Sequence, residues 1–245
     1  MERSGGRRPD ALRPVKFERD YIEYPEGSVL ASMGRTKVLC NASIEPGVPR
    51  WMEAAGTEGG WITAEYALLP RSTQQRVERE TLRPRGRTQE IQRLIGRSLR
   101  AALNLDRLPA VTITVDCDVL QADGGTRTAS ITGGYVALAL ALGRAVGSGE
   151  MEPSIFRPPV AAISAGVVDG DVLLDLDYAE DSAADVDANV VMNAAGDFIE
   201  VQCTAEGEAL ARSQLKEILK VTETGIQQLL AAQREALADT GFAEL

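Results

Sequence analysis

The sequence predicts an α+β protein built from two duplicated halves, each a set of strands followed by helices. Apolar, β-branched stretches separated by turn residues recur in both halves, and a long helical stretch closes each half. Between them, residues 147–159 are interrupted by Gly and Pro. We therefore expect an N-terminal half at 1–146 and a C-terminal half at 147–245. With 245 residues, 44% of them hydrophobic, the chain can bury a substantial core.

The first half alternates strands with helices. Residues 28–44 contain two apolar strands joined through Gly34-Arg35, and apolar residues of 88–104 recur on one helix face at Ile91, Leu94 and Ile95. In chain order we expect strands within 28–44, a strand at 61–69, a helix at 88–104, a strand at 111–120 and a helix at 128–146.

Two hairpins are expected to open the second half. Stretches 160–168 and 172–176 flank Asp169-Gly170, a dipeptide favoured in two-residue hairpin turns. Stretches 189–193 and 198–202 flank Gly196-Asp197 in the same way. A helix at 208–230 and an amphipathic stretch to about residue 238 complete this half.

The composition limits the chemistry. The chain has no histidine, which excludes Ser-His-Asp and Cys-His catalysis and imidazole zinc sites. Its three cysteines, Cys40, Cys117 and Cys203, form no Cys-x-x-Cys pair, and we expect them to be reduced core residues. Proton transfer is left to Asp, Glu, Lys, Tyr or a metal-bound water.

The net charge of −10 is unevenly distributed. Residues 1–107 hold 19 of the 26 Lys and Arg but only 14 of the 36 Asp and Glu, so the remainder of the chain is strongly acidic. Arginine forks match the geometry of phosphate groups. A local arginine field on an acidic protein suits a specific phosphate site better than a surface that binds any nucleic acid.

Membrane association is not expected. The basic N-terminus is followed by no apolar stretch, which does not fit a secretory signal, and we expect no apolar run long enough to cross a membrane. A cytoplasmic protein without a membrane partner is the resulting prediction.

The turn Gly124-Gly125-Thr126-Arg127 is expected at a strand-to-helix junction. Glycines let the backbone approach an anion, and the amides at a helix N-terminus point toward it. Thr126 adds a hydroxyl and Arg127 a cation. A tight turn with a surface arginine explains the same sequence equally well.

Several arginines surround the helix expected at 88–104. Arg83 and Arg85 fit a solvated loop, whereas Arg87 adjoins the helix start and is placed to share an anion with Arg127. Three more share the polar side of the helix, which is either a solvated face or a contact with RNA or another subunit. They are Arg93, Arg97 and Arg100.

Four carboxylates lie within eight residues: Glu180, Asp181, Asp185 and Asp187. Such oxygen-rich clusters suit Mg²⁺ or Mn²⁺, held by one or two carboxylates with water and substrate phosphate. Asp185 and Asp187 share a face if the chain is already extended there. An acidic solvent loop remains an alternative for Glu180 and Asp185.

Taken together, these segments resemble the ribonuclease PH family over nearly the entire chain. The matching stretches are 27–30, 36–50, 60–73, 86–101, 116–132, 180–184, 189–192 and 200–208. The resemblance implies two βαβα-like units related to the ribosomal protein S5 domain 2-like fold, and a homohexamer arranged as a trimer of dimers. It also implies that Arg87, Gly125, Thr126 and Arg127 hold phosphate, and that Asp181 and Asp187 are catalytic and bind a divalent cation such as Mg²⁺.

The activity implied by the resemblance is phosphorolysis. Inorganic phosphate, as co-substrate, removes nucleotides from the 3′ end of precursor tRNA and of other structured RNA such as rRNA, releasing nucleoside diphosphates, and the reverse reaction adds nucleotides. Either an Asp with a raised pKa or a metal-bound water supplies the proton. Relatives often have a histidine where this chain has Gln74 and Gln75, so that histidine is dispensable or the RNA contact differs here. The alternative function is a non-catalytic RNA-binding subunit of an exosome-like ring.

Overall fold

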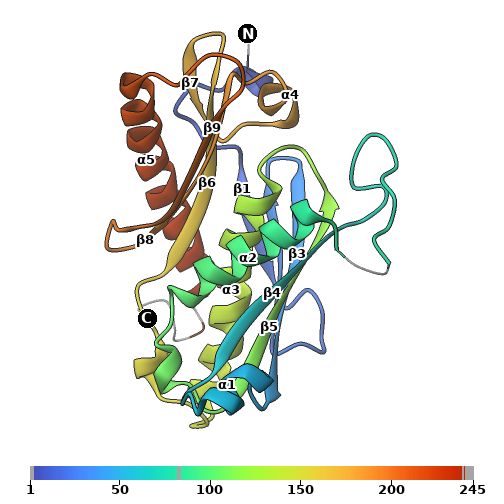
Figure 1. Cartoon of the computed structure of the whole chain (residues 1–245), viewed down its shortest axis with the longest axis vertical. Helices are drawn as coiled ribbons and strands as arrows, with labels where there is room; N and C mark the ends of the chain where they lie inside the picture. The colour runs from blue at the N-terminus through green and yellow to red at the C-terminus, as the bar shows by residue number, and fades with distance from the viewer. Residues whose placement is uncertain (1–2, 82–83, 239, 241–245) are drawn as a thin grey trace.

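The structure, a computed structural model, describes residues 3–81, 84–238 and 240, and it confirms the predicted α+β architecture (Figure 1). Two sheets each have a long helix following them in the chain. Arg83, expected in a solvated loop, lies outside the described residues. Three short 3₁₀ turns occur at Ser4–Gly6, Leu105–Arg107 and Pro153–Ile155.

The first half contains a five-stranded sheet of order β1-β2-β3-β5-β4. Its neighbours are antiparallel except β4 and β5, which run parallel because helix α2 crosses between them. The elements are β1 (Val15–Arg19), β2 (Gly27–Met33), β3 (Thr36–Pro46), α1 (Arg50–Ala55), β4 (Trp61–Leu68), α2 (Gly86–Arg100), β5 (Val111–Gln121) and α3 (Thr126–Gly147).

The second half contains a four-stranded antiparallel sheet of order β7-β6-β8-β9. Both predicted hairpins are present, with β6 paired to β7 and β8 paired to β9. The elements are β6 (Val160–Val168), β7 (Asp171–Leu174), α4 (Tyr178–Asp181), β8 (Val186–Asn193), β9 (Phe198–Ala205) and α5 (Arg212–Leu237).

Helix α3 is the central element of the core. It packs against strands of both sheets, and its apolar residues join those of β6, β8 and α5 in one continuous cluster (Figure 1). By length and composition α3 could cross a membrane, so the expectation that no such run exists was wrong. The helix is apolar on all sides because 89% of its most apolar window is buried within the protein.

Among the strands and α-helices of the described residues, three were not expected from the sequence: β1, α1 and the short helix α4. Strand β8 starts at Val186, earlier than expected, which places Asp187 on the strand and leaves Asp185 before it. Strand β7 ends at Leu174, and Asp175 follows with a positive φ of 56°, outside the conformation of a strand. Cys40 and Cys117 are buried free thiols as expected, whereas Cys203 is only partly buried.

Candidate active site

The glycine-rich turn joins strand β5 to helix α3. Gly124 and Gly125 have positive φ values of 75° and 64°. A Cβ at Gly124 would lie 2.4 Å from the Leu176 carbonyl oxygen, so no other residue fits without displacing the backbone. Thr126 and Arg127 are the first residues of α3, where N–H groups have no intrahelical acceptor. The turn therefore has the geometry of an anion site.

Two arginines accompany this turn. The Arg127 guanidinium, 16% exposed, donates to Gln202 Oε1 at 3.3 Å and lies 3.6 Å from a Glu90 carboxylate oxygen. Arg87 is the second residue of α2 and is exposed; within the described part of the chain it makes no hydrogen bond or ion pair. Arg87 is therefore available to bind a ligand.

Tyr66, on β4, links these arginines to the turn. Its hydroxyl lies 2.8 Å from Thr126 Oγ1. Burial raises the pKa of Tyr66, although the Thr126 hydrogen bond and the charges of Arg87 and Arg127 lower it. The tyrosine consequently stays neutral at physiological pH and orients the threonine without adding charge. Nothing in the sequence pattern pointed to Tyr66 as a site residue.

Asp181 and Asp187 bring negative charge to the same place. Asp181 ends α4, and Asp187 is the second residue of β8. The pKa of Asp181 is raised first by partial removal of water, although the side chain remains exposed, and then by repulsion from Asp187. Burial also raises the pKa of Asp187. Arg127 and Arg87 lower both pKa values, so both arginines lie within electrostatic reach of both carboxylates.

The chemistry of these two carboxylates would suit a divalent cation that takes its other ligands from water and a substrate phosphate. Among the described residues no group of three or more metal-ligating side chains forms a complete site. Mg²⁺, however, is commonly held by one or two carboxylates with water and substrate phosphate. Repulsion between Asp181 and Asp187 is what a cation between them would relieve.

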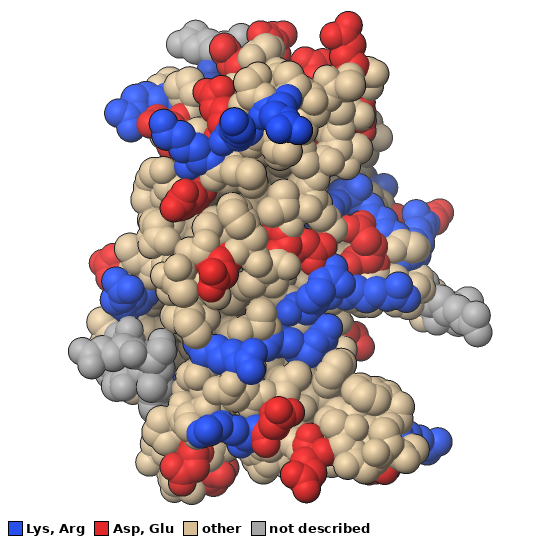
Figure 2. Space-filling view, turned by 60° about the vertical axis from the view of Figure 1, so that its left-hand side comes forward, with Lys and Arg blue, Asp and Glu red and all other residues tan. Residues whose placement is uncertain are grey.

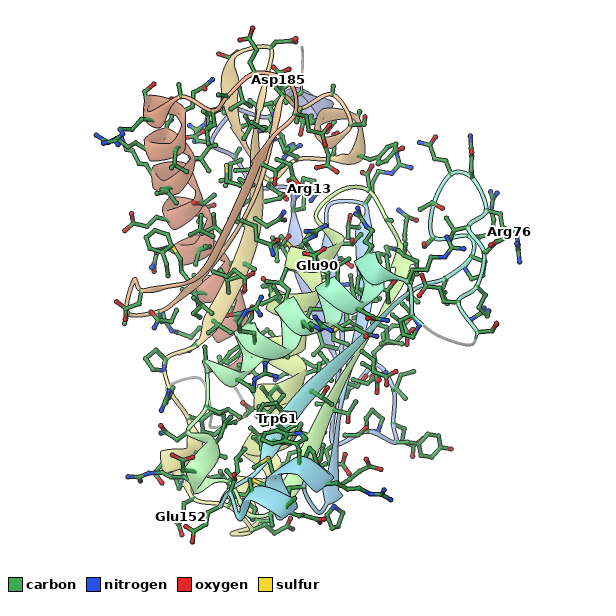
Figure 3. All side chains as sticks on the ribbon, in the orientation of Figure 1. Arg13, Trp61, Arg76, Glu90, Glu152 and Asp185 are labelled. Carbon is green, nitrogen blue, oxygen red and sulfur yellow. The ribbon has the colours of Figure 1, made fainter. Side chains whose placement is uncertain are left out.

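The other two members of the acidic cluster lie elsewhere. Glu180 is 2% exposed and binds Arg3 and Arg7, so the alternative of an acidic solvent loop is wrong for it. It also caps α4 in a capping box with Asp177, a sequence signature that was overlooked. Asp185 is exposed and lies at the upper end of the molecule, away from Glu90 of α2 (Figure 3).

The N-terminal segment packs against the chain between β7 and the end of α4. Arg3 Nε and Nη2 donate to both carboxylate oxygens of Glu180, at 2.7 and 3.1 Å. Arg13 forms a similar fork with Asp175, at 3.1 and 2.7 Å. The sequence alone shows these arginines only as part of a basic N-terminus. Buried charges require partners, but the sequence does not say which segment supplies them.

The predicted arginine face of α2 is divided. Arg97 is bound to both carboxylate oxygens of Glu200, at 2.6 and 2.8 Å, and Arg100 stacks 4.6 Å from the Trp61 ring and donates to the Ile62 carbonyl. Arg93 is exposed, with no hydrogen bond or ion pair to another described residue. Figure 2 shows Lys and Arg in a band across the middle of one face, beside acidic side chains.

The loop between β4 and α2 extends away from the body of the molecule (Figure 1). Gln74 and Gln75 lie on this loop and are exposed, and the neighbouring Arg76 is seen at its outer side (Figure 3). Arg85, expected to be solvated, is exposed and pairs with Glu78. The consequence of glutamine at these positions for RNA binding stays a prediction.

Comparison with known protein families places the chain clearly. Residues 11–142 match the first domain of the 3′ exoribonuclease family, and residues 158–225 match its second domain. The chain is 56% identical over 237 residues to ribonuclease PH of Crocosphaera subtropica, covering 97% of this chain and 98% of the relative. It is 55% identical to ribonuclease PH of Acaryochloris marina, with the same coverage.

Solved structures share the fold at lower identity. The crystal structure of rice Rrp46 aligns with a TM-score of 0.76 at 21% identity, covering 96% of this chain and 100% of that chain. An archaeal exosome core subunit aligns with a TM-score of 0.74 at 23% identity, covering 93% of this chain and 89% of that chain. At these identities the likeness concerns the fold.

Proposed function

The chain belongs to the ribonuclease PH family of phosphorolytic 3′-to-5′ exoribonucleases, and from that premise we propose how its site divides the reaction. Arg87, Gly125, Thr126 and Arg127 hold inorganic phosphate, whereas Asp181 and Asp187 act at the scissile end of the RNA. The observation that carries this proposal is that the charges of both arginines lower the pKa of both carboxylates, which places all four side chains within electrostatic reach of one another.

Binding of the nucleophile is the task of the arginine side. A phosphate oxygen attacks the 3′-terminal phosphorus, the bond from that phosphorus to the preceding 3′ oxygen breaks, and a nucleoside diphosphate leaves. Two anions must meet, so the guanidinium groups and the α3 amides have to neutralise the attacking phosphate and align it. Tyr66 holds the Thr126 hydroxyl in place for this contact.

The carboxylate side serves the leaving group. Asp181 and Asp187 would hold a divalent cation, for which we propose Mg²⁺. When bound, this cation would stabilise the negative charge that develops on the scissile group. Asp187 is fixed because β8 is an inner strand, so that this residue is paired on both sides, with Gly166 of β6 and Thr204 of β9. Asp181 lies at the end of α4, and the N-terminus of this helix is stabilised by the Asp177–Glu180 capping box.

The remaining assignments follow the family. We propose precursor tRNA and structured RNA such as rRNA as substrates, a cytoplasmic location, and a homohexamer arranged as a trimer of dimers. Similarity to subunits of an archaeal exosome core supports a ring. The two family matches, separated at 143–157, support the division into halves at 1–146 and 147–245.

One experiment tests the reaction and the site together. A 3′-extended RNA is incubated with and without phosphate, using wild type and Asp187→Asn. We expect nucleoside diphosphates only with phosphate, and a loss of turnover of about a hundredfold or more in Asp187→Asn with phosphate and RNA still bound. Monophosphate release without phosphate would instead show hydrolysis. Absence of any turnover in wild type would support the non-catalytic ring subunit.

A further inference from the structure

Arg13 is a buried arginine that contacts both sides of the proposed site. It is 5% exposed, and it lies in the upper half of the molecule, between the labelled Asp185 and Glu90 (Figure 3). Its guanidinium binds both carboxylate oxygens of Asp175, and its backbone N–H donates to the same carboxylate at 2.7 Å. Its Nη1 donates to the Asp123 carbonyl, and Nη2 lies 3.5 Å from the Gly124 carbonyl.

The two segments that Arg13 joins also touch each other. A Cβ at Gly124 would lie 2.4 Å from the Leu176 carbonyl oxygen and 2.7 Å from the Asp177 carbonyl carbon. The turn that leads into α3 therefore rests directly on the chain that leads into α4. Any movement of one backbone must be passed to the other, because there is no side chain between them to absorb it.

Thr36 is a second, uncharged support of the same turn. Its hydroxyl donates to the Gly124 carbonyl at 2.7 Å and accepts from the Asp123 N–H at 3.0 Å. Both Arg13 and Thr36 therefore support the turn, but only Arg13 also binds Asp175, at the start of the segment that leads to Asp181. This difference makes Thr36 a useful comparison in an experiment.

Asp175, the partner of Arg13 on the segment that leads to Asp181, is held in an unfavourable position. The residue is fully buried and has a positive φ of 56°, which is costly for a residue other than glycine. The bonds from Arg13 hold its carboxylate, and its backbone N–H donates to Ser164 O at 2.7 Å. The chain from Asp175 to Asp181 begins at this fixed point.

From these contacts we propose that Arg13 is a positioning residue, which sets the phosphate-binding turn at Gly124–Arg127 against the segment that carries Asp181. Its guanidinium donates to protein oxygens through Nε, Nη1 and Nη2, so we assign it to supporting these neighbours and not to holding the phosphate. Reacting groups must be placed to within about 1 Å, and misplacement of this size costs about a hundredfold in rate. The proposal rests on the proposed division of the site.

Arg13→Lys is the main variant, because it keeps the charge beside Asp175 but cannot also reach the carbonyls of the turn. We expect the KM for phosphate to rise about tenfold, kcat to fall about threefold, and RNA affinity to stay within about twofold of wild type. Thr36→Val should raise the phosphate KM in the same direction by about threefold, because it removes one support of the turn.

Arg3→Lys is the matched control. Arg3 is also buried and also forms a fork with a carboxylate, that of Glu180, but its hydrogen bonds do not include the turn. The thermal stability of the Arg3→Lys enzyme should fall, while its KM for phosphate stays within about twofold of wild type. An Arg13→Lys enzyme that loses stability like Arg3→Lys, with unchanged phosphate KM, would overturn the proposal. If Arg13→Lys does not fold, an unchanged phosphate KM in Thr36→Val counts against it.

Arg127→Ala separates this proposal from the site assignment. An increased phosphate KM in Arg127→Ala without any change in Arg13→Lys contradicts only the role of Arg13. An unchanged phosphate KM in Arg127→Ala contradicts the assigned phosphate site, and the role of Arg13 with it. An increase in both variants and in Thr36→Val, with RNA affinity retained, is the result expected.

Discussion

At its N-terminal end, helix α2 presents Arg87 to the carboxylates of the site, whereas at its C-terminal end Arg97 and Arg100 are bound within the protein. The charge of Arg87 lowers the pKa of both Asp181 and Asp187, and Arg87 has no hydrogen-bond partner among the described residues. Arg97 has Glu200, and Arg100 has the Trp61 ring and the Ile62 carbonyl. One helix therefore carries an arginine without a protein partner among the described residues, which we propose binds phosphate, and two arginines that bind within the fold.

The difference shows what helical spacing does and does not reveal. The spacing correctly placed Arg93, Arg97 and Arg100 on one polar side, opposite the buried Ile91 and Leu94. It did not reveal that Arg97 and Arg100 have internal partners, because Glu200 and Trp61 come from other strands. Contact of this face with RNA or another subunit stays a prediction, and Arg93 is the residue best placed for it.

The largest effect on turnover is expected at the N-terminal end of helix α2. Arg87→Ala should lower turnover by about a hundredfold or more, because it removes a charge that stabilises the attacking phosphate. Stability should stay within about 0.5 kcal/mol of wild type, since the side chain is exposed. Phosphate titration of turnover and urea unfolding measure the two quantities. Normal turnover at saturating phosphate would remove Arg87 from the site.

Arg100→Met should show the reverse behaviour. Methionine keeps the packing of the stem but loses the contact with Trp61 and the hydrogen bond to Ile62. We expect the free energy of unfolding to fall by about 1–2 kcal/mol, with kcat and RNA affinity retained. A variant of normal stability that no longer binds RNA would assign Arg100 to the RNA interface instead.

A smaller loss of stability is expected for Arg97→Ala. The Arg97 side chain is 50% exposed, so its ion pair with Glu200 should contribute less than about 1 kcal/mol. Unfolding at low and high salt tests this, because screening should reduce the difference from wild type. A change in the number of subunits, measured by sedimentation, would show that Arg97 serves assembly instead.

Much of the fold could be predicted because local patterns determined it. Strands β2 and β3 meet at Gly34, and both hairpins of the second half turn at the expected dipeptides. Strand β1 was missed because it is a short strand at the edge of its sheet, and none of its five residues is fully buried. Helix α4 was missed because four residues are too few to show helical periodicity.

For the site, sequence alone identified the glycine turn, but not what supports it. Gly124 requires glycine because it packs on Leu176, and Arg13 is fixed by Asp175, contacts between residues far apart in the chain. Tyr66 was missed for the same reason, since an alternating strand gives no sign that one buried hydroxyl meets Thr126. Long-range pairing, rather than residue type, decides these roles.

Glu90 lies one turn from Arg87 on α2, and it offers the smallest and most selective test of the comparison. Its carboxylate is 3.6 Å from Arg127 Nη1, and its side chain is 49% exposed. In the absence of phosphate it therefore neutralises part of the charge that phosphate must bind. Glu90→Gln keeps the size of the side chain but removes this competing charge, so the KM for phosphate should fall by about two- to threefold, with kcat unchanged.

Glu78→Gln is the matched control, because Glu78 pairs with Arg85 and not with Arg127. If the KM rises in Glu90→Gln and not in Glu78→Gln, Glu90 orients Arg127 for phosphate instead of competing with it, and α2 then supplies two residues to the phosphate site at its N-terminal end.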